Sequence, residues 1–319
     1  MTARIEMKKI IIFCLLNIIA SVTFAANQTM DKLTVILDWF PNPDHAPLII
    51  AKQQGFFKEQ GLDVELIGPA DPNDPPKWIA ANKADIGITY QPQFMEQVDR
   101  GLPLVRIGTL IDKPLNCLVV LNESGIKTLA DLKGKQIGGT NGGLSSIMLK
   151  VMLQKQGLTE KDIEFINVRY NLTQALLSKK VDAVTGMMRN FEVPQLELTG
   201  HKVEAFFPEE YGIPNYSELI FITHVNKVHD KRFPKFLTAL KKAVAYLDTH
   251  PKETWKQFAK DYPEANNKVN REAWFATIPY FAEDPFYFDS EEWRRFADFM
   301  QKNKLIKNPQ PISRYAIMI

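Results

Sequence analysis

Cysteine is scarce in this chain of 319 residues, which contains only Cys14 and Cys117. Cys14 lies in an N-terminal segment that we expect to be removed, so Cys117 has no partner for an internal disulfide. This excludes a small secreted scaffold held together by disulfides and fits a protein exported to a bacterial periplasm. No motif around Cys117 supports a nucleophile, and we expect its thiol to be buried.

Motifs of common enzyme classes are also missing. The sequence contains no G-x-S-x-G, no H-E-x-x-H and no G-x-x-x-x-G-K-[ST]. None of its five histidines is paired at a metal-binding spacing on one helix. His45 begins an expected helix, where we expect it to satisfy a backbone group, with a ligand contact as the alternative. We therefore expect no catalytic residue, no metal and no cofactor.

An excess of charge of one sign is absent. Lysine and arginine number 39 and the acidic residues 37. Without the expected leader, which contains three basic residues and one acidic residue, the two counts are equal. Nucleic acids and anionic membrane surfaces favour clustered positive charge, so neither is an expected partner.

Hydrophobic runs long enough to span a membrane are missing too. The longest run, residues 10–20, has eleven residues, whereas a spanning helix needs roughly 20. It follows Arg4, Lys8 and Lys9 and precedes small residues near Ala25. A charged start, a short apolar core and a small-residue exit predict a secretory signal peptide over residues 1–25.

The remaining sequence alternates short apolar runs with amphipathic segments. Expected strands cover 33–37, 63–68 and the runs ADIGITY and LVRIGTLI, with helices between them, including one over 45–61. A second set follows residues 116–120 and includes helices over 128–134 and 145–157. Strands that alternate with helices predict parallel sheets covered by helices on both faces.

Two similar α/β units predict two lobes with a ligand cleft between them. The chain is expected to cross between the lobes near 116–120 and again near 219–228. The first lobe is then 31–115 together with 223–319, which contains an amphipathic helix over 233–250. The second lobe, 116–222, is inserted into it. Ligands of such sheets bind beyond the carboxyl ends of strands, and hinge closure around them is a known mode.

Aromatic and polar residues gather where the expected strands end. Asp38-Trp39 follows the first strand, GITYQPQ continues the third, and GGTNGGLSS precedes a helix. GMMRNFEVPQLE and NYSEL lie at two further strand ends. Each has a structural alternative: Trp39 as core filler, Ser145 as a helix cap, or a tyrosine in the core. Together they favour a flat heteroaromatic ligand that is uncharged or weakly basic, although a sugar would also use aromatic walls.

Several stretches resemble one family. "LDWFPNPDHAPLIIAKQQGFFKEQGLDVEL", "KADIGITY", "DLKGKQIGG" and "HPKETW" resemble ThiY-type periplasmic solute-binding proteins, which serve ABC transporters that take up thiamine pyrimidine precursors. The resemblance runs from about Leu33 to the last helices. It implies a type II periplasmic binding protein fold and a ligand such as N-formyl-4-amino-5-aminomethyl-2-methylpyrimidine. It also implies an inner-membrane permease as partner and a monomeric protein.

The resemblance also assigns positions to the site. Asp38 and Trp39 would form the pocket floor, and Asn42 would belong to a rigid lip beside it. Val193 stands where similar proteins have glycine after the glutamate of their N-x-E-G motif. The expected ligand-binding residues are Asp38, Trp39, Asn42, Tyr90, Gln93, Asn141, Gly142, Gly143, Ser145, Glu192, Tyr216 and Glu218.

Three other functions remain as alternatives. Riboflavin-binding and alkanesulfonate-binding relatives look similar, but Arg189 is the one strand-end cation that would suit a sulfonate. The related pyrimidine synthases need a histidine where this chain has Gln93, and a cysteine-rich run where it has NYSEL. Both features are missing, so an enzyme is the less favoured reading.

Overall fold

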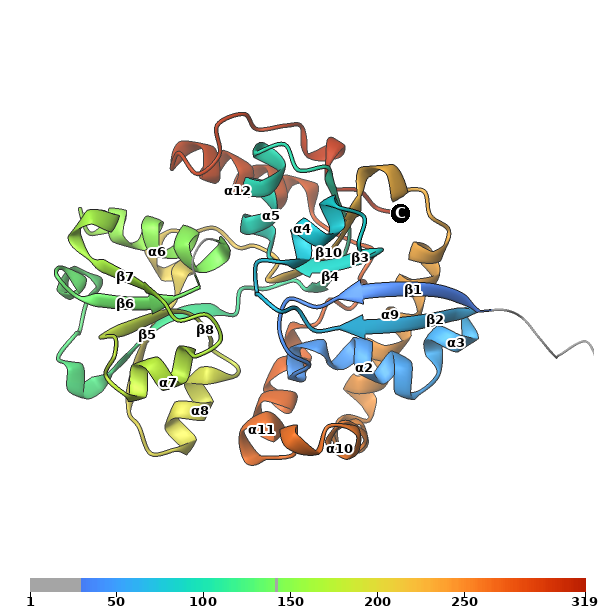
Figure 1. Ribbon diagram of the computed structural model, residues 1–319, viewed down its shortest axis with the longest axis horizontal. Helices are drawn as coiled ribbons and strands as arrows, with labels where there is room; N and C mark the ends of the chain where they lie inside the picture. Colours follow the sequence, from blue (N-terminus) through green and yellow to red (C-terminus); the bar gives the residue numbers. More distant parts are fainter. Residues whose placement is uncertain (1–29, 141–142) are drawn as a thin grey trace, which may run out of the picture.

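The computed structural model describes residues 30–140 and 143–319, which form two α/β lobes side by side (Figure 1). The expected signal peptide, Asn141 and Gly142 lie outside the described residues. Each lobe is built on one five-stranded sheet. The predicted architecture of two lobes joined by two chain crossings is confirmed.

The sheet of the first lobe has the order β2-β1-β3-β10-β4. Its strands are β1 (Asp31–Ile36), β2 (Leu62–Ile67), β3 (Ile86–Thr89), β4 (Leu104–Ile111) and β10 (Leu219–His224). The first three run parallel, and β10 runs antiparallel between β3 and β4. The chain thus returns from the second lobe into the middle of the first sheet.

The sheet of the second lobe has the order β7-β6-β8-β5-β9. Its strands are β5 (Asn116–Leu121), β6 (Gln136–Gly139), β7 (Glu164–Asn167), β8 (Ala183–Met188) and β9 (Val203–Phe206). Here β5, which enters from the first lobe, runs antiparallel to β8 and β9. In both sheets, therefore, the strand that enters from the other lobe is the antiparallel one.

Helices cover both faces of each sheet (Figure 1). Below the first sheet in this view lie α2 (Ala46–Gln53), α3 (Phe56–Glu59), α9 (Arg232–Thr249), α10 (Pro251–Asp261) and α11 (Lys268–Thr277). Above it lie α4 (Pro75–Ala80), α5 (Gln91–Asp99) and α12 (Ser290–Lys302). The second sheet lies between α6 (Gly143–Lys155) on one side and α7 (Leu172–Leu177) and α8 (Glu192–Leu198) on the other. Among the described residues, no helix combines the length and apolarity needed to cross a bilayer.

Some predicted boundaries were wrong. The helix expected over 45–61 is divided at Gly55, whose φ of +76° lies in the left-handed region that glycine adopts without strain. The segment expected as a helix over 128–134 is a short 3₁₀ turn, Leu129–Leu132. Helix α5 begins at Gln91, because Pro92 suits a first turn whose N–H groups need no helical partner. β9, α8 and α11 were not predicted.

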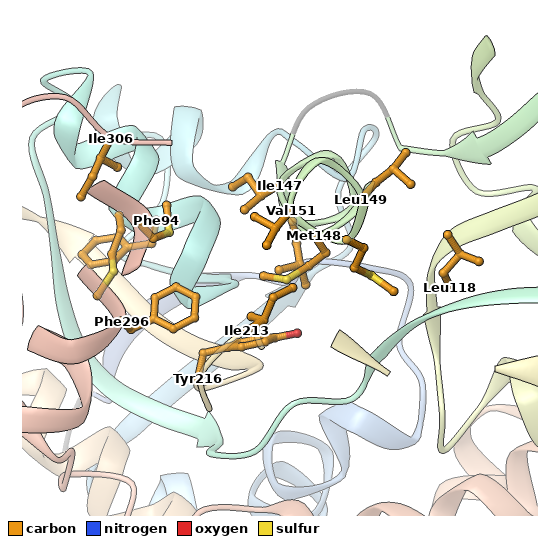
Figure 2. Packing of buried hydrophobic residues seen from close by; sticks show 14 of the residues in the cluster. Phe94, Leu118, Ile147, Met148, Leu149, Val151, Ile213, Tyr216, Phe296 and Ile306 are labelled. Atoms are coloured by element: carbon orange, nitrogen blue, oxygen red, sulfur yellow. The ribbon is translucent and has the colours of Figure 1, made fainter. Parts of the chain in front are cut away.

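One hydrophobic cluster is shared by the two lobes (Figure 2). It combines Phe94 and Phe296 of the first lobe with Leu118 of the second, and the apolar side of α6 packs into it. α5 and α6 are in contact where the lobes meet. This buried contact therefore holds the two lobes together where α5 meets α6.

Arg106 holds the C-terminal segment against the first sheet. It is fully buried in β4, and none of the described carboxylates pairs with it. Its guanidinium donates to the carbonyls of Phe286 (3.2 Å), Tyr287 (2.7 Å) and Ile317 (2.9 Å), and to the hydroxyl of Thr109 (2.7 Å). Burial lowers its pKa to about 9. Backbone carbonyls and a hydroxyl therefore replace the water molecules that the guanidinium group loses when it is buried.

Replacing Arg106 tests this arrangement. We expect Arg106→Ala to lower the free energy of unfolding by roughly 3–5 kcal/mol, because a large buried side chain is removed and three backbone carbonyls and the buried Thr109 hydroxyl lose their donor. Urea denaturation of the purified chain measures the change. The matched control is Arg100→Ala, whose exposed side chain pairs with Glu96 on the same helix and should cost below about 1 kcal/mol. Equal losses in the two variants would contradict the role given to Arg106.

Candidate functional site

A cavity of about 450 Å³ lies between the two lobes. Its walls come from the ends of β1 and β3 and from α11 on one side, and from β8, α7 and α8 on the other. It is lined by Asp38, Trp39, Phe40, Pro41, Asn42, Asp44, Tyr90, Leu172, Gly186, Met188, Phe191, Glu192, Glu264, Ala265 and Asn270. We call it the aromatic cavity. It occupies the place where ligands of open α/β sheets bind.

Asp38 is held by two partners at the floor of this cavity. His45 Nε2 lies 2.9 Å from its Oδ1, and the Tyr90 hydroxyl donates to its Oδ2 at 2.7 Å. His45 Nδ1 accepts from the backbone N–H of Asn42, so Nε2 carries the hydrogen that is donated to Asp38. His45 is fully buried, and the expectation that it satisfies a backbone group is confirmed. Each carboxylate oxygen keeps a free lone pair for a ligand donor.

Trp39 follows Asp38 and reaches across to the second lobe. It is half-buried and packs against that lobe's apolar cluster around Leu172. Its ring lies edge-on to Tyr170, with centroids 4.5 Å apart, and Tyr170 also lies 4.5 Å from Phe40. Tyr170 in turn donates to the carbonyl of Pro69 at 2.9 Å. Three aromatic rings thus form one cluster that contains residues of both lobes, and two of them, Trp39 and Phe40, line the cavity.

A buried hydrogen-bond cluster also joins the lobes. Asn190, which follows β8, donates to Asp44 Oδ1 and to Thr277 Oγ1, each at 2.7 Å. All three side chains are buried, and Thr277 Oγ1 lies 3.1 Å from the same oxygen of Asp44. Burial raises the pKa of the Asp44 carboxyl, opposed by His45 and by the Asn190 hydrogen bond. We call these three residues the interlobe cluster.

Glu192 begins α8 and places a carboxylate in the second-lobe wall. Its Oε2 accepts from the backbone N–H of Met188 at 2.8 Å. Burial raises its pKa to about 7, although the Met188 N–H acts in the opposite direction. This carboxyl therefore exchanges its proton near neutral pH.

The charges of the aromatic cavity have one sign. Asp38, Asp44 and Glu192 line it, and Glu264 lies at its exposed rim. None of the described lining residues is a lysine or an arginine. Arg189, the expected strand-end cation, instead pairs with Glu209 at 2.6 Å and lies over the Phe207 ring. The cavity therefore suits cations and hydrogen-bond donors and disfavours anions.

A smaller space adjoins the aromatic cavity. It measures about 30 Å³ and shares Trp39, Tyr90, Leu172, Gly186 and Met188 with the larger one. Its further lining residues are Pro72, Asn73, Gln93, Asn116, Thr140, Leu144 and Ser145. We call it the polar compartment. It brings Gln93 and Ser145, two predicted site residues, to the same place.

Two predicted site residues lie outside both linings. Tyr216 is fully buried against Phe296, with ring centroids 5.6 Å apart (Figure 2). Glu218 is fully buried as well, and its Oε2 accepts from the backbone N–H groups of Leu115 (2.6 Å) and Asn116 (3.1 Å). Burial raises its pKa to about 7. Contact of Tyr216 and Glu218 with a ligand stays a prediction, whereas both side chains have clear partners within the protein.

Seven of the predicted residues line one or both spaces, including Gln93 and Ser145 in the polar compartment. Asp38, Trp39, Asn42, Tyr90 and Glu192 line the aromatic cavity. Gly143 begins α6, while Asn141 and Gly142 lie outside the described residues.

Sequence reasoning missed several lining residues. Asp44 lies in the same stretch as Asp38 and Asn42, so its neighbours were a usable signal. Asn116 was assigned only to a crossing strand, and Asn270 lies on a helix that was not predicted. Leu172 and Met188 look like ordinary core residues, and no sequence signal distinguishes them.

Two expectations concern residues outside the site. Cys117 is fully buried, and its thiol donates to the carbonyl of Met187 at 3.2 Å, as expected for a structural cysteine. Burial raises the pKa of this thiol well above its ordinary value. Within residues 30–140 and 143–319, no group of three or more histidine, cysteine or acidic side chains is placed to hold a metal ion.

Comparison with known proteins identifies relatives along most of the chain. A protein of Haemophilus influenzae, provisionally described as a thiamine biosynthesis protein, is 47% identical over 290 residues, covering 91% of this chain and 92% of the relative. The formylaminopyrimidine-binding protein of Halalkalibacterium halodurans is 27% identical over 90% of both chains. The 4-amino-5-hydroxymethyl-2-methylpyrimidine phosphate synthase THI11 of Saccharomyces cerevisiae is also 27% identical, over 90% of this chain and 87% of its own.

Solved structures with the same fold include solute-binding proteins. The alkanesulfonate-binding protein SsuA of Xanthomonas axonopodis pv. citri superposes with a TM-score of 0.71 at 17% identity, covering 89% of this chain and 97% of its own. A Candida albicans protein, described as having the generic periplasmic binding protein fold, gives a TM-score of 0.72 at 17% identity, covering 91% of this chain and 97% of its own. The model of the family described as NMT1/THI5 like matches residues 42–254. The chain therefore has a periplasmic binding protein fold and belongs to the NMT1/THI5-like family.

Proposed function

We propose that this protein is the periplasmic solute-binding subunit of an ABC transporter that takes up a thiamine pyrimidine precursor. The ligand would be N-formyl-4-amino-5-aminomethyl-2-methylpyrimidine or a close relative, used for thiamine biosynthesis by salvage. The observation that carries this proposal is a cavity with aromatic walls and several carboxylates but no described cation. The formylaminopyrimidine-binding relative supports the same ligand class.

An aminopyrimidine matches this cavity chemically. Its flat ring can pack against Trp39 and Tyr90, since aromatic pairs gain roughly 0.5–1.5 kcal/mol beyond the burial of their area. Its amino group and any protonated ring nitrogen are donors, and Asp38, Asp44 and Glu192 offer acceptor oxygens. Hydrogen bonds in which one partner is charged are about twice as strong as neutral ones. The ring therefore has both a stacking surface and acceptors within one site.

The same features weigh against the alternatives. A sulfonate carries a negative charge, and the carboxylates of the cavity would repel it. Arg189, which could offset that charge, is already paired with Glu209. A pyrimidine synthase would need a histidine at Gln93, so the yeast relatives share the fold without requiring the activity here. The similarity to SsuA, at 17% identity, likewise concerns the fold and does not indicate a sulfonate ligand.

Domain limits and partners complete the proposal. The first lobe comprises 31–115 and 223–319, the second comprises 116–222, and residues 1–25 are a signal peptide. A monomer closes its lobes around the ligand and docks on an inner-membrane permease. The contacts of Trp39 and Asn190 across the cavity support closure, because each joins residues of both lobes.

A ligand panel tests the proposed function. We expect isothermal titration calorimetry of the chain without its first 25 residues to give micromolar or tighter affinity for the formylaminopyrimidine. Riboflavin and taurine should bind at least about a hundredfold more weakly, because neither combines the size and donor pattern of an aminopyrimidine. Tight binding of riboflavin or taurine without binding of the pyrimidine would overturn the assignment.

Replacing Trp39 tests the stacking wall. Trp39→Ala should weaken pyrimidine binding by roughly tenfold or more, since one aromatic face is lost, while the far-UV circular dichroism spectrum stays that of a folded protein. Trp39→Phe, which keeps an aromatic ring, should restore part of the affinity. An unfolded Trp39→Ala variant would instead identify Trp39 as a core residue.

Replacing Asn190 tests the interlobe cluster. Asn190→Ala leaves the buried Asp44 carboxylate without its main donor in the closed form, at a cost of roughly 1–3 kcal/mol, so ligand affinity should fall by about five- to a hundredfold. Calorimetry measures the affinity, and small-angle X-ray scattering should show a larger radius of gyration without ligand.

The matched control for Asn190 is Arg169→Ala. Arg169 also joins the lobes, through Asp71 at 2.9 Å, but its side chain is 56% exposed. Exposed pairs contribute about 0–1 kcal/mol, so this variant should change affinity by less than about fivefold. If both variants behave alike, burial of the interlobe cluster does not control closure.

A further inference from the structure

The polar compartment brings together three buried polar side chains. Gln93, Asn116 and Ser145 are 4%, 2% and 8% exposed, and all three line this space. Among the described residues, Asn116 Oδ1 is fully enclosed and has no hydrogen-bond partner. By contrast, both carboxylate oxygens of Asp38 in the aromatic cavity have partners within the protein. Asn116 Oδ1 is therefore an acceptor whose donor the described residues do not supply, beside an amide and a hydroxyl that can bind the same group.

Physical chemistry limits what can fill this space. Buried amides and hydroxyls are almost always hydrogen-bonded, and each one left unpaired costs about 1–3 kcal/mol. The compartment measures about 30 Å³, and a water molecule needs roughly 10–15 Å³ on the same measure. It therefore holds about two or three non-hydrogen atoms, such as a hydroxymethyl group or part of a formamide.

The charge of the compartment limits the occupant further. Its described lining residues include no lysine, arginine, histidine or carboxylate. A phosphate is larger than the space, and none of the described lining residues carries a positive charge to offset that of a phosphate. Amide and hydroxyl side chains both donate and accept, so they suit an uncharged O–H, N–H or C=O group.

The two spaces are continuous. Trp39, Tyr90 and Gly186 belong to both linings, so a ring in the aromatic cavity can carry a substituent into the polar compartment. Gly186 is required at this passage, because it has a φ of +92° and a Cβ there would lie 2.3 Å from Ser145 Oγ. A side chain at this position would push the Ser145 hydroxyl out of place.

We propose that Gln93, Asn116 and Ser145 form a second subsite, which binds a short uncharged hydrogen-bonding arm of the ligand and rejects a phosphorylated one. This inference rests on the proposed function, because the ring that carries the arm occupies the aromatic cavity. Asn116 is then a specificity-determining residue. It selects among pyrimidines that share the same ring.

The experiment compares three ligands that differ only in the arm. Calorimetry is carried out with 4-amino-5-hydroxymethyl-2-methylpyrimidine, with its phosphate ester, and with 4-amino-2,5-dimethylpyrimidine, which has no polar arm. We expect the wild-type chain to prefer the hydroxymethyl compound over the dimethyl compound by about tenfold, as one or two neutral hydrogen bonds allow. It should bind the phosphate ester at least about tenfold more weakly than the hydroxymethyl compound.

Asn116→Leu keeps the volume of the side chain and removes its hydrogen bonding. This variant should bind the dimethyl compound as the wild type does and should lose most of the preference for the hydroxymethyl arm. Asn122→Leu is the control, since Asn122 follows the same strand but lines neither space. It should keep the wild-type preference.

Each remaining result overturns the subsite. Equal wild-type affinities for the hydroxymethyl and dimethyl compounds would mean that the compartment holds an ordered water only, while the proposed function stands. Equal weakening of both ligands by Asn116→Leu would show a structural role. Tighter binding of the phosphate ester would contradict the neutral character of the subsite. Binding of none of the three would overturn the subsite, and the titration with the formylaminopyrimidine then shows whether the proposed function falls with it.

Discussion

The buried carboxylate of Glu218 ties together the two segments that connect the lobes. It lies at the second crossing and accepts from the backbone N–H groups of Leu115 and Asn116 at the first. These bonds hold the two connecting segments against each other at the points where β5 and β10 begin. Every wall of the site is placed relative to those two strands. Asn116, which donates one of the N–H groups, also lines the polar compartment, so the crossing between the lobes and the proposed subsite share a residue.

The site between the lobes combines buried charge with a closed shape. Asp38, Asp44 and Glu192 would repel one another if they were fully ionised and left without donors. Hydrogen bonds to the three carboxylates offset part of this repulsion; they come from His45, Tyr90, Asn190 and the Met188 N–H. A ligand with several hydrogen-bond donors would offset the remaining repulsion. This requirement links the electrostatics of the cavity to the ligand class proposed here. An anion would add to the repulsion, although structural neighbours of the same fold bind sulfonates.

Much of the fold could be predicted because hydrophobic periodicity is local. The alternation of strands and helices, the crossings at β5 and β10, and the amphipathic α9 all follow from spacing within a few turns of chain. The elements β9, α8 and α11 were not predicted because they are short or have mixed polarity. Of these, α11 contributes Asn270 and Thr277 to the site region. The break at Gly55 was missed because the apolar spacing continues through it. Family resemblance supplied the ligand class, which periodicity alone did not.

The sequence by itself determined which residues end the strands, and thereby placed Asp38, Trp39 and Tyr90 at strand ends of one sheet and Glu192 beyond a strand of the other. It also predicted nearly equal numbers of basic and acidic residues and no internal disulfide. Tertiary structure decided how these residues are used. Tyr216 became core and Glu218 a tie between crossings, whereas Asp44 and Asn116 joined the site. Burial and hydrogen-bond satisfaction depend on atoms contributed by distant segments, and Asn190 meets Asp44 across 146 positions of sequence. No local sequence pattern predicts this contact, because the two side chains come together only when the lobes pack against each other.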